Sequence, residues 1–349
     1  MPKPTILVTG ATGKTGTPTT FALLERGFPV RALVHQRDAR AERLGGAGAE
    51  IVVGSLESPR DLETAMRGVS RAYFCPPLEP GTLRRATNFA VAAQDAKLEA
   101  VVHLSQWLAD PNHPAIHARE KWLSNRVMAS LQGIATVRIE PGWFADNYFA
   151  VLRQAAQFGI LGLPLGNGQN APPSNEDIAA VISSCLADPG PHAGQAYRPT
   201  GPTLLGPTEI AATMGQALGR RVRYQNVPMK MFLKATTSLD LAPFVVTQLY
   251  WFLQDYQKNA FGIGAPTTAV EQIAGRPAED FLTIAKRYVA KTPAARRGIA
   301  ATLREAGGMI AALTSRPLDI AETERRFGLP QLAGFQLAAQ SPEWLTSHQ

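Results

Sequence analysis

The first 140 residues alternate short apolar runs with longer segments in which apolar residues recur three and four positions apart. The short runs are rich in β-branched residues and predict strands, at residues 5–9, 30–34, 50–53, 71–75, 100–105 and 135–139. The longer segments predict amphipathic helices, at residues 16–26, 40–45, 59–66, 82–96 and 118–131. Strands and helices that alternate in this way are typical of a parallel sheet with helices on both faces, so the sequence predicts a doubly wound α/β fold.

The pattern becomes less regular after residue 140. The sequence predicts a helix at 175–187, a short strand at 196–199 and a second helix at 208–218. Connections rich in glycine and proline separate these elements, at 159–173, 188–194 and 199–207. Residues 229–290 are predicted to be helical, and their aromatic side chains have the spacing of a core stripe.

These patterns divide the chain into three parts. They predict a Rossmann domain from residues 1–140 with about 175–200, a smaller and mostly helical substrate-binding lobe from 141–174 with 201–290, and a C-terminal helical extension at 291–349. In the extension, Asp319 is expected to cap a helix that ends near Phe327. Two roles stay open for the extension: a lid that docks on the lobe, and the contact of a homodimer.

A glycine-rich turn follows the first predicted strand and opens the first predicted helix. Gly10, Gly13 and Gly16 have the spacing GxxGxxG. In such a βα unit the first glycine permits a tight turn, the second lets a pyrophosphate approach the backbone, and the third allows close packing of helix and strand. The turn therefore predicts a dinucleotide site whose pyrophosphate-binding residues are Thr9, Gly10, Thr12, Gly13, Lys14, Thr15 and Gly16. Val8 stands where a P-loop needs its first glycine, which excludes an NTPase.

The end of the second predicted strand indicates which dinucleotide is bound. An acid at this position binds the ribose hydroxyls of NAD, whereas an arginine accommodates the 2′-phosphate of NADP. Here the strand is followed by His35 and Arg37, and no acid appears until Asp38. We therefore predict that NADP(H) is preferred over NAD(H), with Arg37 at the phosphate and His35 beside it. The alternative is that the local arginines are only solvated.

Several short motifs in a fixed order resemble the NmrA-like group of atypical short-chain dehydrogenases. They are TGATGKTG at 9–16, VRALVH at 30–35, GSL at 54–56, PP at 76–77, LS at 104–105, PGWFADN at 141–147 and the segment at 270–277. The resemblance covers residues 4 to about 290 and implies an NAD(P)-binding Rossmann fold. The chain also departs from the family pattern at two places. Ser55 stands where an aspartate is usual. The last ~60 residues have no familiar counterpart, and their length is typical of an accessory segment.

The resemblance assigns further residues to the cofactor. It implies that Ser55 and Leu56 lie near the adenine and that Pro76 and Pro77 lie against the ribose. The residues that it implies beside the nicotinamide are Pro141, Gly142, Trp143 and Phe144. Trp143 and Trp107 either flank an apolar substrate cleft or serve only as packing residues.

Ordinary short-chain dehydrogenases carry a tyrosine four residues before a lysine on one helix, and no tyrosine of this chain has that spacing. His117 and Lys121 have it instead, on a predicted helix. We predict that Lys121 binds the cofactor ribose and is the general acid or base, as the lysine of related reductases implies, and that His117 shuttles the proton. Ser105, at a strand end, is predicted to bind a substrate carbonyl. The alternatives are cofactor binding alone for Lys121, a helix start for His117 and strand termination for Ser105.

Composition narrows the class of protein. The 349-residue chain is 45% hydrophobic and 18% charged, which supplies ample material for a core and argues against disorder. No apolar run approaches the ~18 residues that a membrane span needs, and the first residues lack a signal-peptide pattern. The two cysteines, Cys75 and Cys185, form neither a disulfide framework nor a CxxC metal site, so we expect a cytoplasmic protein without a metal.

The formal net charge of +7 raises the question of nucleic acid. Residues 286–349 hold nine basic and five acidic side chains, but they lack aromatic interleaving and a helix-turn-helix signature, so a nucleic-acid partner ranks last. The leading prediction is an NAD(P)H-dependent reductase that transfers a hydride to a carbonyl, quinone, azo or activated alkene group of an aromatic or apolar small molecule. The alternative is a non-catalytic redox sensor that binds the dinucleotide and acts through a protein partner.

Overall fold

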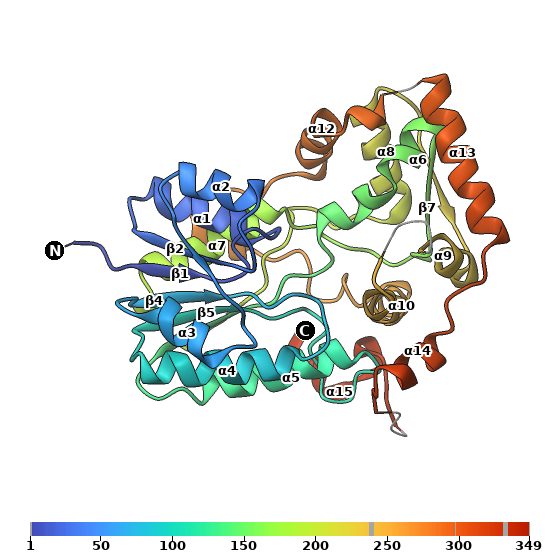
Figure 1. Cartoon of the computed structure of the whole chain (residues 1–349). Helices are drawn as coiled ribbons and strands as arrows, with labels where there is room; N and C mark the ends of the chain where they lie inside the picture. Colours follow the sequence, from blue (N-terminus) through green and yellow to red (C-terminus); the bar gives the residue numbers. More distant parts are fainter. Residues whose placement is uncertain (1, 237–240, 297, 331–333, 349) are drawn as a thin grey trace.

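The computed structural model describes residues 2–236, 241–296, 298–330 and 334–348. At its centre lies a seven-stranded parallel sheet with the order β3-β2-β1-β4-β5-β6-β8 (Figure 1). Its strands are β1 (Ile6–Val8), β2 (Val30–Val34), β3 (Glu50–Val53), β4 (Arg71–Phe74), β5 (Ala100–Leu104), β6 (Ala135–Ile139) and β8 (Ala196–Tyr197). The strand order reverses between β1 and β4, which is where open α/β sheets bind ligands at their carboxyl edge.

Helices cover both faces of this sheet, as the alternating sequence pattern predicts (Figure 1). One face carries α1 (Gly16–Glu25), α2 (Ala39–Gly46), α7 (Asn175–Ala187) and α11 (Ala269–Ala274), and the other carries α3 (Pro59–Met66), α4 (Thr82–Asp95) and α5 (Ile116–Ala129). Successive residues of β1 serve opposite cores: Ile6 and Val8 pack with Leu23 of α1, whereas Leu7 packs with Leu62 of α3. The predicted doubly wound Rossmann fold is confirmed.

The second lobe holds its own large core, mostly between helices. Its elements are η1 (Ala145–Val151), α6 (Leu152–Phe158), β7 (Ile160–Leu163), α8 (Pro207–Leu218), β9 (Arg223–Asn226), α9 (Met229–Ala235), α10 (Pro243–Gln257) and α12 (Phe281–Lys291). The short helix η2 (Gly190–His192) instead packs on β6 of the Rossmann sheet. The strands β7 and β9 form a separate parallel pair. Neither strand is predicted above: β7 falls within the connection at 159–173, and residues 223–226 have no predicted element. The strand β7 contains Gly162, and β9 has the polar sequence RYQN, so neither has the residue pattern that predicts a strand.

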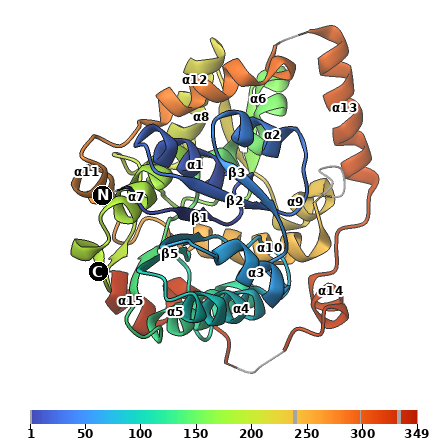
Figure 2. The same ribbon diagram turned by 60° about the vertical axis from the view of Figure 1, so that its left-hand side comes forward.

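The C-terminal extension runs over the outside of the molecule and returns to the Rossmann domain (Figure 2). It contains η4 (Pro293–Ala295), α13 (Ile299–Thr314), α14 (Ile320–Arg326), η5 (Ala338–Gln340) and α15 (Pro342–His348). The Asp319 carboxylate accepts the amide of Glu322, which confirms the predicted cap. The helix α13 packs on α6 and α9 but leaves Ile299, Leu303 and Ile310 exposed, whereas α15 lies beside α5 (Figures 1 and 2). A homodimer contact through this extension remains a prediction.

Candidate functional site

The glycine turn is shaped by how closely the chain approaches itself. Gly10 has a left-handed φ of +58°, and a Cβ atom there would lie 2.8 Å from the Cys75 carbonyl oxygen. A Cβ on Gly16 would lie 2.1 Å from the Gly10 carbonyl oxygen, and one on Gly13 would lie 3.0 Å from that same atom. The Gly13 amide donates to the Gly10 carbonyl at 2.8 Å. Gly10 and Gly16 are therefore required by the geometry of the turn before any ligand is considered, and a side chain at Gly13 would make a tight contact.

The backbone of this turn suits an anion. In the part of the chain that the structure describes, the amides of Thr12, Lys14 and Thr15 donate to no protein acceptor. The turn leads into the N-terminus of α1, whose dipole favours negative charge. A dinucleotide pyrophosphate fits this set of donors.

The side chains of two threonines in the turn are already hydrogen-bonded within the protein. The Thr9 hydroxyl accepts the Cys75 amide and donates to the Tyr73 carbonyl. The buried Thr15 hydroxyl lies 2.9 Å from the Tyr73 hydroxyl. Both side chains tie the turn to β4, and the Thr9 amide also donates to the Tyr73 carbonyl, so of these two residues only Thr15 has an amide available to a cofactor.

Lys14 connects the turn to the second lobe. Its Nζ lies 2.7 Å from Oδ2 of Asp146, at the start of η1. The Asp146 side chain is buried, and its other oxygen has no partner among the described residues. The lysine itself is exposed, so it can exchange this carboxylate for a ligand phosphate.

At the end of β2, His35 and Arg37 are both exposed. Arg37 has a single ion-pair contact, 3.5 Å from Glu42. Asp38 is engaged elsewhere: it caps α2 through the amides of Arg40 and Ala41, and the Arg40 side chain holds the pKa of this carboxyl below its usual range. The first acid after β2 is therefore committed to the helix, and Arg37 is the side chain with room to meet a phosphate.

The residues that the resemblance assigns to adenine and ribose lie at the ends of β3 and β4. The Ser55 amide donates to Asp61 Oδ2 at 2.9 Å, and its hydroxyl accepts the Glu57 amide. Leu56 is half-buried. Of the two prolines after β4, Pro76 is buried and Pro77 is exposed. Because parallel strands end at the same edge of a sheet, all four residues share that edge with the glycine turn.

Lys121 is buried on α5, with 4% of its surface exposed. Its Nζ donates to the Leu104 carbonyl at the end of β5. Burial lowers the pKa of this ammonium to about 8, and the nearby Cys75 thiol and Glu120 oppose the shift. The lysine thus reaches the sheet edge between β4 and β5, where it is protonated at neutral pH and yet releases its proton more readily than an ordinary lysine.

His117 lies in the first turn of α5 and is also buried. Its Nδ1 lies 3.2 Å from the Thr82 hydroxyl, and its amide donates to the Gln248 side chain of α10. Burial, together with the positive charges of Lys121 and Arg85, holds its pKa well below the usual range. The imidazole is therefore neutral at physiological pH, and its direct contact is with Thr82.

Ser105 follows β5 directly and is 3% exposed. Its amide donates to the Ile139 carbonyl, but its hydroxyl has no hydrogen-bond partner among the described residues. A buried hydroxyl without a partner costs roughly 1–3 kcal/mol, so such groups usually serve a ligand or an ordered water. Ser105 thus has an available donor one residue after the carbonyl that holds Lys121.

The two tryptophans expected at a cleft belong to the core of the second lobe. Trp107 is 1% exposed and donates its indole N–H to the Ala260 carbonyl. Trp143 is buried against Tyr256 and Phe261. The packing alternative therefore describes Trp107, and Trp143 presents no open face to a substrate. The neighbouring Pro141 accepts the Trp107 amide, which places the segment 141–144 beside the loop after β5.

Three residues at this site are absent from the set predicted above. Cys75 follows β4 and is half-buried beside the glycine turn, close to Lys121. Asp146 meets Lys14, and Gln248 holds the start of α5. Only the position of Cys75 at a strand end gave any signal, because the other two contacts join segments more than 100 residues apart.

The chain belongs to the NmrA-like family. The family model matches residues 2–262. Among similar proteins, an NAD(P)H azoreductase from Xenophilus azovorans is 31% identical over 297 residues, which covers 83% of this chain and all of the relative. Quinone oxidoreductase 2 from Escherichia coli is 26% identical and covers 68% of this chain and 82% of its own.

Solved structures support the same fold. An NADPH-dependent quinone oxidoreductase from E. coli, complexed with NADPH, superposes with a TM-score of 0.71 at 24% identity, over 81% of this chain and 99% of its own. The negative transcriptional regulator NmrA, in complex with NADP, superposes with a TM-score of 0.70 at 19% identity, over 82% of this chain and 95% of its own. Proteins that share this fold thus include both a reductase and a regulator.

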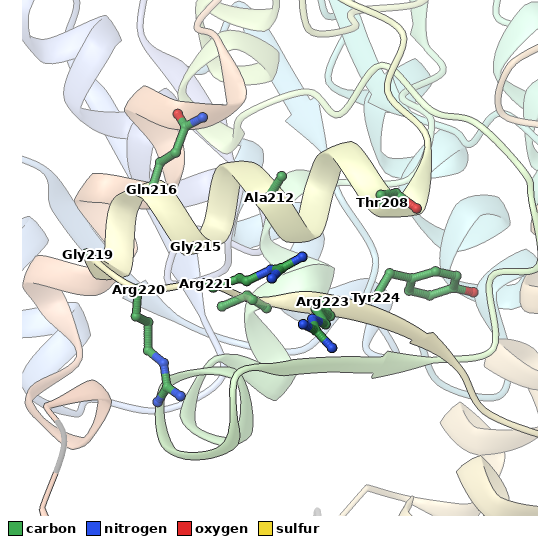
Figure 3. Close-up of a pocket in the computed structure, with 10 residues that line it drawn as sticks. Thr208, Ala212, Gly215, Gln216, Gly219, Arg220, Arg221, Arg223 and Tyr224 are labelled. Atoms are coloured by element: carbon green, nitrogen blue, oxygen red, sulfur yellow. The ribbon is translucent and has the colours of Figure 1, made fainter.

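A separate hollow lies between α8 and β9 in the second lobe (Figure 3). It has a volume of about 560 Å³, and its lining includes Arg220, Arg221 and Arg223. None of the predicted site residues lines it. The arginines adjoin the carboxyl end of α8, whose carbonyl dipole attracts cations, so their position is explained without an anionic ligand.

Proposed function

We propose that this NmrA-like protein is an NAD(P)H-dependent reductase that transfers a hydride to a quinone, azo, carbonyl or activated alkene group, with Lys121 as the proton donor. The observation that carries the proposal is the pair formed at the end of β5: the buried Lys121 ammonium on the Leu104 carbonyl, and the unpartnered hydroxyl of Ser105 one residue later. The azoreductase and quinone oxidoreductase relatives support this class of acceptor.

The cofactor would be held by backbone donors and two cations. The amides of Thr12, Lys14 and Thr15 would donate to the pyrophosphate, and the Lys14 side chain would exchange Asp146 for a phosphate oxygen. Arg37 supports a preference for NADP(H) over NAD(H), since it has only a long contact with Glu42 to give up. When bound, the reduced nicotinamide supplies the hydride.

The chain's own residues manage the acceptor and the proton. Ser105 donates its hydroxyl hydrogen to the acceptor atom that gains negative charge, which orients that atom toward Lys121. Lys121 then breaks one Nζ–H bond as the new O–H or N–H bond of the product forms, and solvent restores the proton afterwards. With a pKa of about 8, Lys121 is charged at pH 7 and still a competent acid. His117, neutral and bound to Thr82, holds the start of α5 and is not required as a shuttle.

A second function rests on a specific observation. The Lys121 ammonium already has a carbonyl partner within the protein, which suits a structural lysine, and the regulator NmrA has the same fold. In that case the chain is a sensor that binds the dinucleotide and reports to a protein partner. For either function we propose a cytoplasmic location, where both free cysteines would stay reduced.

The test is NADPH consumption over a panel of quinones, azo dyes and aromatic carbonyls. We expect turnover of at least one class, a loss of about 10²–10⁴-fold in kcat for Lys121→Met, and no change for the exposed control Lys230→Met. Dinucleotide affinity is measured in parallel by nucleotide fluorescence. Absence of turnover across the panel, together with unchanged affinity in Lys121→Met, would establish the sensor instead.

A further inference from the structure

The last described segment of the chain, residues 334–348, lies against the loop that joins Ser105 to α5 (Figures 1 and 2). We call this segment the tail and residues 105–115 the substrate-side loop. Trp344 donates its indole N–H to the Trp107 carbonyl at 2.8 Å, and the Ser341 hydroxyl donates to Asp110 Oδ2 at 2.7 Å. The tail thus bonds the substrate-side loop near its start and at its middle.

Two further contacts extend this attachment toward α5. The Gln336 amide donates to the Asn112 carbonyl at 3.1 Å. The Ala339 amide donates to Oδ1 of Asp255, a fully buried residue of α10. The other oxygen, Oδ2, lies 2.7 Å from Nε2 of His113. One carboxylate therefore joins the tail, α10 and the substrate-side loop.

The hydrogen bonds of His113 continue this connection to the helix. Its Nδ1 accepts the Ala115 amide at 2.9 Å, so the ring proton sits on Nε2 and is donated to Asp255. Ala115 is the residue immediately before α5. The tail is thereby linked through Asp255 and His113 to the start of the helix that carries His117 and Lys121.

The tail is packed as tightly as a core element. Trp344 and Ser341 are both 2% exposed, and the Trp344 ring stacks on His348 with centroids 3.9 Å apart. A Cβ atom on Gly264 would lie 2.1 Å from the His348 carbonyl oxygen, so only glycine admits the tail at this point. None of the tail's hydrogen bonds reaches the glycine turn.

We propose that the tail is a positioning element for the acceptor side of the site. The tail holds the substrate-side loop near its start and at its middle, and through Asp255 and His113 at its end. It thereby sets Ser105 relative to Lys121, and it acts on turnover rather than on dinucleotide binding. The tail lies beyond residues 2–262, which match the family model. The inference rests on the proposed reductase function for its kinetic test, and a second measurement is independent of that function.

The kinetic test uses Ser341→Ala, which removes the hydroxyl that Asp110 accepts, with Thr346→Ala as the matched control on the exposed side of α15. We expect kcat/KM for the acceptor to fall about tenfold or more in Ser341→Ala, since small displacements of reacting groups are costly, while the NADPH Kd stays within about twofold. Ser341→Thr, which keeps a hydroxyl, should restore most of the loss. An equal loss of nucleotide affinity, or no kinetic change despite a lower melting temperature, would overturn the proposal.

Hydrogen–deuterium exchange separates failure of this inference from failure of the proposed function. In Ser341→Ala, amides of residues 105–118 should exchange faster, while those of residues 10–16 should be unchanged. This outcome supports the positioning role even if the unaltered chain turns over none of the panel. Unchanged exchange in residues 105–118 would overturn it whether or not the protein is a reductase.

Discussion

The glycine turn and the substrate-side loop lie at the same edge of the sheet, but they are held in different ways. The turn is fixed by segments within the first 75 residues, through the contacts of Gly10 with Cys75 and of Thr9 and Thr15 with Tyr73. The substrate-side loop is fixed by α10 and the tail, more than 100 residues away. Apart from the contact of Lys14 with Asp146, cofactor binding and acceptor geometry are therefore expected to depend on separate parts of the chain, and most substitutions should affect one without the other.

The largest expected effect concerns the glycine turn, which is held by nearby segments of the chain. In Gly16→Ala, the added Cβ would meet the Gly10 carbonyl oxygen, so the turn must deform. We expect NADPH binding to weaken about 100-fold, roughly 2.7 kcal/mol, measured by fluorescence titration. Gly46→Ala is the control, because a Cβ there meets nothing within 4 Å. Wild-type affinity in Gly16→Ala would show that the turn does not hold the cofactor.

The second prediction tests the contacts by which α10 and the tail hold the substrate-side loop. Asp255→Asn replaces one of the two accepting oxygens with a donor, so either the Ala339 amide or the His113 ring loses its partner. We expect the free energy of unfolding to fall by about 1–3 kcal/mol in urea titration, with the NADPH Kd preserved in the folded protein. Asp95→Asn, an exposed position at the end of α4, is the control. A parallel loss of nucleotide affinity would contradict the independence of the two regions.

The pH dependence of kcat and of stability tests the role of Lys121. Its pKa of about 8 means that the proton-donating form is lost above that pH, so kcat should fall up to tenfold per pH unit when proton transfer limits the rate. The free energy of unfolding changes with pH in the opposite direction to kcat. Between about pH 8, the pKa of Lys121 in the folded protein, and 10.5, its ordinary pKa, the unfolded chain keeps a proton that the folded protein has released. The free energy of unfolding should therefore rise with pH in that window. Lys121→Met should remove both dependences.

The smallest effect concerns the choice of dinucleotide. Arg37→Ala should weaken NADPH binding roughly threefold to tenfold and leave NADH binding unchanged, because an exposed cation interacts with one phosphate across solvent. Arg60→Ala, another exposed arginine, should change neither. Equal weakening of both nucleotides, or none, would remove Arg37 from the specificity of the site.

The Rossmann sheet could be predicted from local sequence, because its strands and helices have hydrophobic periods that match their environment. Local sequence also located the glycine turn, and the four-residue spacing singled out Lys121. The pairing of β7 with β9, the packing of Trp107 in a core and the effect of burial on the pKa of Lys121 became visible only in the folded chain. These features arise where distant segments meet, and a buried contact between such segments leaves no periodic signal in either one.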